Sequence, residues 1–279
     1  MTISEIIKNA LQEDIGSGDH SSLASVPENA QGKMKLLAKA NGIIAGIEVA
    51  KEVLRQIDPS ISMKCFKKDG EEITYGEVVF ELEGSARNML TAERTLLNFL
   101  QRMSGITTVS KQYADAVKGT KTKILDTRKT TPNLRELEKY AVKTGGSENH
   151  RFGLYDMIML KDNHIDFAGG IEKAIDNTHN YLKKKGLNLK IEIETRTIEE
   201  VKRVVNHGNI DRIMLDNFTP EKIKEALLLI DGKYETEASG GITLENIKEY
   251  AQTGVDFISI GALTHHIKSL DLSLKFTAL

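Results

Sequence analysis

The first 105 residues alternate between helical and strand patterns of apolar positions. Apolar side chains on one face predict a helix over residues 4–13, with Ser4 as its cap. Alternation predicts strands over 33–44, 61–66 and 77–83, and a further helix over 46–57 ends before Pro59. These elements form a small α/β layer of their own.

A long helix is predicted over residues 85–105, and its pattern resumes through Tyr113 and Val117 before Gly119. Its apolar stripe runs through Leu96, Leu97 and Leu100, which turns the opposite, polar stripe outward. The polar stripe comprises Arg87, Thr91, Arg94, Asn98 and Gln101.

After Gly119 the pattern changes to strand followed by helix, repeated along the chain. Intervening segments such as 198–205 and 220–230 have helical spacing. Repeated βα units predict a parallel sheet, either closed as a barrel or open, and six strands are fewer than the usual eight. The strands are expected at 123–126, 156–160, 189–193, 212–215, 234–238 and 255–260.

Polar and charged residues follow each of these strands, where α/β barrels collect their chemistry. Several are cations, and guanidinium forks bind carboxylate and phosphate in bidentate fashion. The pattern predicts a pocket for a small polyanion, and the alternative is a set of surface ion pairs. The cations are Arg94, Arg128, Lys129, His150, Arg151 and Lys161.

Composition narrows the classes of function. Hydrophobic residues make up 40% and charged residues 28%, as in an ordinary globular protein. The net charge of −2 disfavours broad nucleic-acid binding, and 5% aromatic residues without Trp offer few stacking platforms. One cysteine, Cys65, excludes an intramolecular disulfide, and we expect its thiol to be half-buried in a strand. No apolar run is long enough for a membrane span, and the first residues do not resemble a signal peptide, so we expect a cytoplasmic protein.

A run of motifs resembles the quinolinate phosphoribosyltransferases, the carboxylating nicotinate-nucleotide pyrophosphorylases. It includes LDTRKTTP, NHR, LKDNHI, IEIET, MLDNF, EASGGI and GVDFISIGALTH, and upstream EDIGSGD and LTAERTLLNFLQRMSGI. The chain departs from the family's usual pattern at Asn133 and Ser147, which stand in place of Gly, and at His266, in place of Ser.

The resemblance implies an α/β fold with an N-terminal α/β sandwich domain followed by a partly open α/β barrel. The expected domains are 1–105 for the sandwich and 106–266 for the barrel. Residues 267–279 are expected to return to the N-terminal domain.

The implied reaction is phosphoribosyl transfer from phosphoribosyl pyrophosphate to the ring nitrogen of quinolinate, with loss of CO2, giving nicotinate mononucleotide and pyrophosphate in NAD biosynthesis. By resemblance, quinolinate is held by Arg128, His150, Arg151 and Lys161, joined by Arg94. Lys129 is placed on the pyrophosphate side. The resemblance also implies a two-fold homodimer, or a higher oligomer, in which Arg94 enters the partner's site.

Two carboxylates, Glu194 and Asp216, end strands one βα unit apart. Beside a polyphosphate such a pair indicates Mg²⁺, ribose hydroxyls or both, and it could stabilise a positively charged sugar. We expect Glu192 to face the other way, and the choice of Glu194 rests on the resemblance. His164 and His265 are not expected to hold zinc or iron.

Glycine turns after the two late strands predict a phosphate site, because such turns present free backbone N–H groups. Late strands are also the usual phosphate position in barrels. We assign the 5-phosphate to Ser239, Gly240, Gly241 and Gly261, with His265 nearby.

Two other classes of function remain open from the residues alone. Lys161 at a strand end could form a Schiff base in an aldolase-type barrel. A non-catalytic binder of anions or nucleic acid could use Lys121, Lys123, Arg128 and Lys129. Asn133 and Ser147 also leave open a homologue that acts on another acid.

Overall fold

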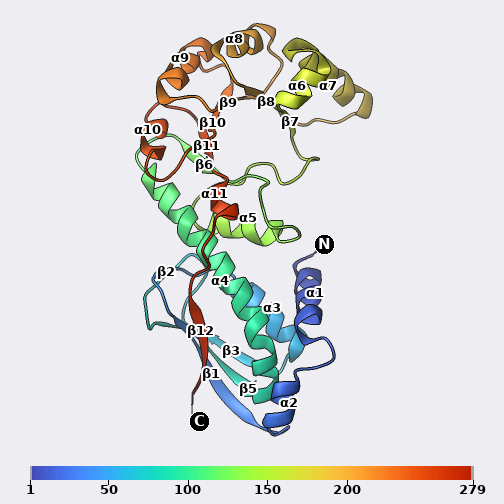
Figure 1. Ribbon diagram of the computed structural model, residues 1–279, viewed down its shortest axis with the longest axis vertical. Coiled ribbons are helices and arrows are strands. Elements are labelled where there is room, and N and C mark those ends of the chain that lie inside the picture. The colour runs from blue at the N-terminus through green and yellow to red at the C-terminus, as the bar shows by residue number, and fades with distance from the viewer. Residues whose placement is uncertain (1, 278–279) are drawn as a thin grey trace. The chain divides into compact units, whose positions relative to one another are not determined.

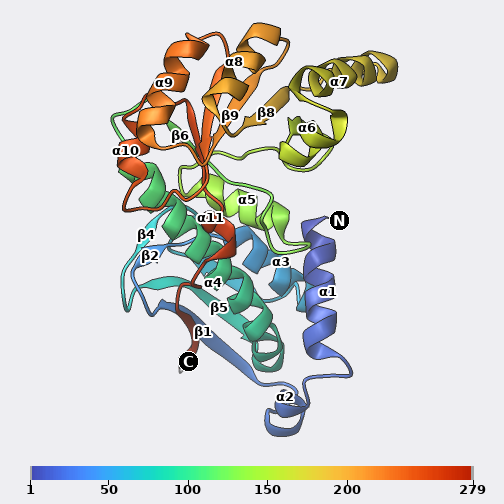
Figure 2. The same ribbon diagram turned by 45° about the horizontal axis from the view of Figure 1, so that its top comes forward.

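The computed structural model describes residues 2–277 and divides the chain into two compact units. The first comprises 1–111, 130–146 and 262–279, and the second comprises 112–129 and 147–261. Figures 1 and 2 label their elements. The sequence placed residues 106–111, 130–146 and 262–266 in the barrel domain, whereas here they cluster with the first unit.

The first unit is built on a four-stranded antiparallel sheet in the order β12-β1-β5-β3. The last strand of the chain therefore pairs with the first, from Lys33 opposite Thr277 to Ala38 opposite Leu272. A short antiparallel pair, β2 and β4, lies outside this sheet. The strands are β1 (Gln31–Ala38), β2 (Gly42–Ile43), β3 (Ser62–Cys65), β4 (Glu72–Ile73), β5 (Val78–Ser85) and β12 (Leu272–Thr277).

Six helices have residues in the first unit. The capping residue of the first is Thr2, which accepts from the Glu5 N–H, so the prediction of Ser4 was wrong by two residues. The single strand predicted over 33–44 is interrupted after Ala38, and the Cys65 thiol is exposed rather than half-buried. The helices are α1 (Ile3–Ile15), α2 (His20–Ser25), α3 (Ile47–Ile57), α4 (Ala86–Ala116), α5 (Arg135–Thr144) and α11 (Ala262–His265).

Helix α4 is continuous over 31 residues, where the sequence predicted a helix and its resumption. The predicted apolar stripe is buried: Leu96, Leu97 and Leu100 are at most 2% exposed. Arg94, on the polar stripe, is exposed. The predicted orientation of this helix is confirmed.

The second unit contains a six-stranded parallel sheet in the order β6-β11-β10-β9-β8-β7. Each predicted strand is found, with shifts of one to two residues at its ends. Among the described residues the outermost strands, β6 and β7, do not pair with each other, which matches the expected partly open barrel. The strands are β6 (Lys123–Leu125), β7 (Ile158–Leu160), β8 (Ile191–Thr195), β9 (Arg212–Asp216), β10 (Glu235–Ser239) and β11 (Phe257–Ser259).

Helices cover the outside of these strands, as Figure 2 shows for α8 and α9. The neighbouring helices α8 and α9 each bury one apolar face, through Val201 and Val204 in one and Ile223 and Ala226 in the other. The crossover helices are α6 (Asp162–Ala168), α7 (Ile171–Lys185), α8 (Ile198–His207), α9 (Pro220–Ile230) and α10 (Ile247–Ala251). No helix in residues 2–277 is long and apolar enough to cross a membrane.

Register divides the inward-facing side chains of the second unit into layers along the strands. Glu192 of β8 and Glu235 of β10 both pair in register with Arg212 of β9. Two residues further along, Glu237 and Glu194 pair with Met214. The polar ends of the strands therefore reach one edge of the sheet together.

Candidate active site

The two basic segments predicted from the sequence are joined by backbone hydrogen bonds. Glu148 donates its N–H to the Ile124 carbonyl at 2.7 Å, and Asp126 donates its N–H to the Glu148 carbonyl at 3.1 Å. Residue 148 thus forms a parallel bridge to Leu125 on the edge of β6 that no strand covers. The buried Asp126 carboxylate accepts the His150 N–H at 2.8 Å. This brings Arg128 and Arg151 to the same end of the barrel.

Arg128 and Arg151 are half-buried and close enough to interact electrostatically. Burial and the positive charge of Arg128 lower the pKa of Arg151. The Nε of Arg128 is buried without a hydrogen-bond partner. Arg151 donates to the Met157 carbonyl at 3.1 Å, which orients its guanidinium. Two neighbouring positive charges that are half-buried favour the binding of an anion between them.

The ring of His150 is buried and held at both nitrogens. Its Nδ1 accepts the Arg151 N–H at 2.7 Å, while Nε2 lies 3.0 Å from Glu192 and 3.3 Å from Glu237. Burial lowers its pKa, but the bonds with the two carboxylates raise it to about 9. To become doubly protonated, the ring would have to take up a proton at Nδ1 and lose the hydrogen bond from the Arg151 N–H, which opposes the rise in its pKa. The geometry therefore describes a neutral ring with its proton on Nε2.

The two carboxylates below His150 are fully buried. Burial and the charge of Glu237 raise the pKa of Glu192 to about 7. Glu237 is also desolvated, but hydrogen bonding to His150 and the charge of Arg212 lower its pKa overall. The expectation that Glu192 faces the other way was wrong, because residues two apart in a strand lie on the same face. Glu192 and Glu194 both point inward, in successive layers.

The predicted donor-side carboxylates lie at neighbouring strand ends. Lys161, just after β7, pairs with Glu194 at 3.6 Å. Burial raises the pKa of Glu194, Lys161 lowers it, and Asp216 raises it. Asn217 donates to Asp216 at 2.6 Å. A pair of carboxylates that repel each other fits a divalent cation, because oxygen ligands are what Mg²⁺ prefers.

The turn after β10 has the backbone form of an anion site. Gly240 and Gly241 have φ of 92° and 64°, in the left-handed region. A Cβ on Gly240 would collide with Asn217, whose N–H bonds to the Ser239 carbonyl at 2.8 Å. A Cβ on Gly241 would meet nothing within 4 Å. Only a glycine fits at Gly240, next to Asp216.

Five predicted site residues are exposed: Arg94, Lys129, Lys161, Gly241 and His265. Lys129 follows Arg128 in the second unit. Arg94 and His265 belong to the first unit. The His265 ring meets that of His266 edge to face, with 4.3 Å between centroids. The predicted residues Arg128, His150, Arg151, Lys161, Glu194, Asp216, Ser239, Gly240, Gly241 and Gly261 all belong to the second unit.

Two of the departures from the family pattern have a structural reading. Asn133 has φ of 66°, a conformation that glycine adopts freely and asparagine tolerates better than most residues. Ser147 is buried, at 3% exposure. Asparagine is therefore compatible with the backbone conformation at position 133.

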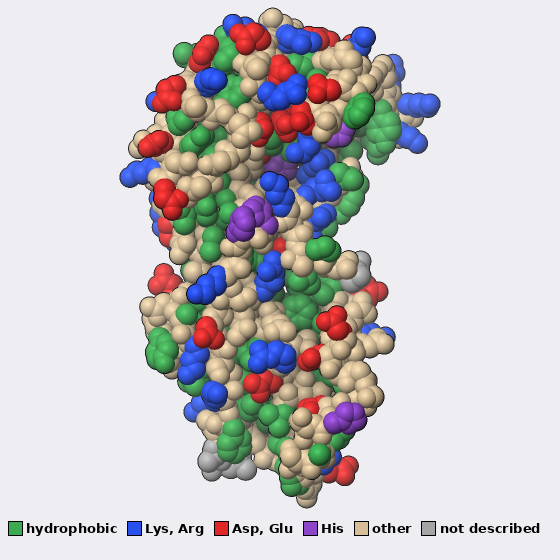
Figure 3. Space-filling model, viewed as in Figure 1, with side chains coloured by type: hydrophobic (Ala, Val, Ile, Leu, Met, Phe, Trp, Pro, Cys, Tyr) green, Lys and Arg blue, Asp and Glu red, His purple; other side chains and the backbone are tan. Residues whose placement is uncertain are grey.

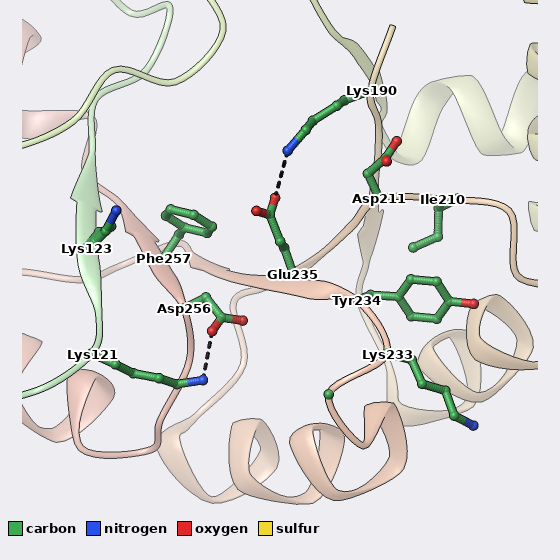
Figure 4. Close-up of a pocket in the computed structure, with 11 residues that line it drawn as sticks. Lys121, Lys123, Lys190, Ile210, Asp211, Lys233, Tyr234, Glu235, Asp256 and Phe257 are labelled. Atoms are coloured by element: carbon green, nitrogen blue, oxygen red, sulfur yellow. Dashed lines mark hydrogen bonds and ion pairs between the residues drawn. The ribbon is translucent and has the colours of Figure 1, made fainter. Parts of the chain in front are cut away.

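A cavity of about 690 Å³ opens at the opposite, N-terminal ends of the strands. Figure 4 shows Lys121 paired with Asp256 and Lys190 paired with Glu235 along its wall. Its charges are largely matched by these ion pairs, and it lies at the opposite strand ends from the predicted site residues. Figure 3 shows a group of Lys and Arg side chains on the visible surface of the second unit.

Sequence reasoning missed Asp126, Arg212 and Glu237. Asp126 stands inside the LDTRKTTP motif, and Glu237 precedes the SGG turn by two residues, so the strand period could have placed it inside the barrel. Arg212 gave no signal, since a strand-initial arginine is usually solvated.

Fold and site together define a parallel α/β barrel-type protein whose strand ends hold a basic subsite beside a carboxylate pair. The model of the quinolinate phosphoribosyl transferase C-terminal domain matches residues 106–275, and that of the N-terminal domain matches residues 19–104. The chain belongs to the quinolinate phosphoribosyltransferase family.

Individual relatives agree over almost the whole chain. "Quinolinate phosphoribosyltransferase [decarboxylating] 2b, mitochondrial" of Nicotiana tabacum is 45% identical, covering 98% of this chain and 82% of the relative. "Probable nicotinate-nucleotide pyrophosphorylase [carboxylating]" of Bacillus subtilis is 42% identical, covering 99% and 94%. The crystal structure of NadC from Streptococcus pyogenes is similar with a TM-score of 0.93 and 40% identity, covering 99% of this chain and 97% of that one.

Proposed function

We propose that this chain transfers the phosphoribosyl group of phosphoribosyl pyrophosphate to the ring nitrogen of quinolinate and removes the 2-carboxylate as CO2. The products are nicotinate mononucleotide and pyrophosphate, for NAD biosynthesis. The observation that carries the assignment of the acceptor site is the pair of half-buried guanidiniums of Arg128 and Arg151. They are close enough that the charge of Arg128, together with burial, lowers the pKa of Arg151. A dicarboxylate supplies the two anions that such a pair requires.

The acceptor side is assigned to Arg128, His150, Arg151 and Lys161. Lys161 carries an exposed side chain at the end of β7, and Arg151 is oriented by the Met157 carbonyl. Because both arginines are fork-shaped donors, each can bind one carboxylate in a fixed plane. Fixing both carboxylates orients the ring nitrogen toward the sugar.

The donor side is assigned to Glu194, Asp216, Lys129 and the Ser239–Gly241 turn, with Gly261 and His265 completing the phosphate site. Backbone N–H groups of a glycine turn suit the 5-phosphate. Lys129 is placed against the pyrophosphate. Glu194 and Asp216 lie where the ribose would meet the carboxyl ends of β8 and β9.

The reaction follows from this placement. The lone pair of the ring nitrogen forms a bond to C1 of the ribose while the C1–O bond breaks and its electron pair leaves with pyrophosphate. Positive charge develops on the sugar, which Glu194 and Asp216 stabilise. In the pyridinium product the C2–carboxylate bond breaks, CO2 leaves, and the carbanion beside the cationic nitrogen takes up a proton.

The carboxylate pair Glu194 and Asp216 would hold Mg²⁺. Burial and, to a smaller extent, the charge of Asp216 raise the pKa of Glu194, and a divalent cation would relieve this repulsion. When bound, the ion supplies charge neutralisation for the anionic donor.

The same proposal includes a two-fold homodimer with shared active sites. Arg94 is exposed on α4 in the first unit, and its apolar neighbours on the helix are buried. An exposed arginine is available to the site of a partner subunit, and a two-fold interface would form two equal sites. A cytoplasmic location is proposed for this chain, although some plant relatives are named mitochondrial or chloroplastic.

A Schiff-base aldolase using Lys161 is the second candidate. Such lysines are activated by desolvation, whereas the Lys161 side chain is 49% exposed and pairs with Glu194. Turnover of quinolinate with phosphoribosyl pyrophosphate, followed by mass spectrometry of the nucleotide, tests the proposal. We expect nicotinate mononucleotide and no adduct after borohydride treatment. A borohydride-trapped adduct at Lys161, without nucleotide formation, would support the aldolase.

A further inference from the structure

We propose that Glu192, Glu237 and Arg212 form a buried positioning network that fixes the ring of His150 and, through it, the backbone from which Arg151 reaches the acceptor carboxylate. None of the three is assigned to touch a substrate. The role in catalysis rests on the function proposed above, while the geometry of the network does not.

The network occupies a layer of the barrel that apolar side chains normally fill. Glu192 and Glu237 are 0% exposed, and the Arg212 side chain is 11% exposed. Arg212 donates to Glu237 at 3.0 Å and to Glu235 at 3.1 Å. Buried charges are costly, and apolar residues of similar volume are often at least as stable, so stability alone does not account for this layer.

The imidazole connects this layer with the anion site. Its Nε2 faces the two carboxylates, and its Nδ1 accepts the N–H of Arg151 at 2.7 Å. Only one ring orientation and one tautomer satisfy both sides, because carboxylates require the proton on Nε2 and the backbone N–H requires a lone pair on Nδ1. Asp126 holds the N–H of His150 itself at 2.8 Å. The peptide between His150 and Arg151 is thus fixed on both sides.

At its other end the network is anchored at the floor of the barrel. The Arg212 guanidinium stacks on Phe257, 4.0 Å from the ring centroid. Phe257 and Glu235 line the cavity at the N-terminal strand ends, where Figure 4 shows them side by side on neighbouring strands. Arg212 is therefore held by an aromatic face and two carboxylates, and it cannot turn without breaking these contacts.

The three groups His150, Glu192 and Glu237 also have the composition of a metal site, with ligand atoms within 4.8 Å of one another. The Arg212 charge beside Glu237 disfavours a cation there, and His150 Nε2 lies only 3.0 Å from Glu192 and 3.3 Å from Glu237, which leaves little room for an ion. We therefore assign the cluster to positioning, and a bound metal is an outcome that the test must detect.

The direct test is the tautomer of His150 in the wild-type protein. Nitrogen chemical shifts of 15N-histidine-labelled protein, with His150→Gln to assign one signal among the seven histidines, should show a protonated Nε2 and an unprotonated Nδ1. An Nδ1–H ring or a doubly protonated ring at pH 7 would overturn the proposal. Stoichiometric metal in the purified protein that is lost in the Glu237→Gln variant would do the same.

The proposed effect of the network on quinolinate binding is tested by the variants Glu192→Gln and Glu237→Gln. The matched control is Glu172→Gln, at a helix residue that pairs with Arg203. We expect KM for quinolinate to rise by about tenfold in each network variant, a loss typical of a slightly misplaced group, with KM for phosphoribosyl pyrophosphate little changed. The His150 signal should shift in the same variants, and the control should match wild type. Unchanged KM for quinolinate in folded variants would overturn the role. If wild type itself fails to turn over quinolinate, the proposed function fails, while the tautomer result still stands.

Discussion

The ammonium of Lys161 lies 3.6 Å from the carboxylate of Glu194, across the C-terminal ends of the neighbouring strands β7 and β8. This ion pair joins the two halves of the site, since Lys161 is assigned to the acceptor and Glu194 to the donor. In the proposed mechanism an arriving carboxylate competes with Glu194 for the ammonium and leaves the Glu194 carboxylate available to the ribose cation. The proposed acceptor and donor sites are therefore adjacent, on neighbouring strands of the sheet.

The fork of Arg151 should be necessary in addition to its charge. Arg151→Lys keeps the cation but removes the bidentate geometry and the bond to the Met157 carbonyl. We expect kcat/KM for quinolinate to fall by about tenfold or more, the loss of a charged hydrogen bond. Arg203→Lys, an exposed arginine paired with Glu172, is the matched control and should match wild type. Equal kinetics for both variants would remove Arg151 from the site.

Chelation of Mg²⁺ should abolish transfer, and added Mg²⁺ should restore it. Asp216→Asn removes one charge of the carboxylate pair and should raise KM for phosphoribosyl pyrophosphate by about tenfold. Asp176→Asn, on an exposed helix face, serves as control. Full turnover in excess chelator would show that Glu194 and Asp216 have another role.

Shared sites predict complementation between two inactive variants. Arg94→Ala and Lys129→Ala should each be nearly inactive, and after subunit exchange about half the dimers carry one intact site, restoring roughly a quarter of wild-type activity. Arg128→Ala mixed with Lys129→Ala is the control, since both residues lie in the second unit and every hybrid site lacks one of them. Hybrids confirmed by native mass spectrometry without recovered activity would place Arg94 in the site of its own subunit.

The two glycines of the turn after β10 should respond differently to alanine. Both have positive φ, which costs an alanine about 1–2 kcal/mol, but only Gly240 faces Asn217 closely. Gly240→Ala should raise KM for phosphoribosyl pyrophosphate clearly more than Gly241→Ala, with KM for quinolinate less affected. An equal effect of both substitutions would show that this turn does not bind the 5-phosphate.

Much of the barrel could be predicted from the sequence because each buried strand ends in a polar or glycine residue. Lys161, Glu194 and Asp216 mark three such ends. Elements with weak apolar periodicity were missed, among them α2 and the two-residue strand β4. Short pieces of this kind are specified by their tertiary neighbours, and local spacing carries little information about them.

The sequence predicted which residues lie at the strand ends of the candidate site, but not the charged residues buried inside the barrel behind them. The residues at the strand ends were found, whereas Glu237, which contacts His150, and Arg212, which contacts Glu237, were not. Inward-facing charge in a barrel is visible in a sequence only when the register between strands is known. That register follows from packing of the whole sheet, which spacing along one strand cannot provide.

The central claim is decarboxylating transfer to quinolinate. It is tested most directly with quinolinate labelled at the 2-carboxylate, in the presence of phosphoribosyl pyrophosphate and Mg²⁺. We predict that labelled CO2 and nicotinate mononucleotide form one for one, and that nicotinate is a poor substrate, because one guanidinium would be left without its carboxylate. Nucleotide formed from nicotinate as fast as from quinolinate, or transfer without release of labelled CO2, would contradict the account.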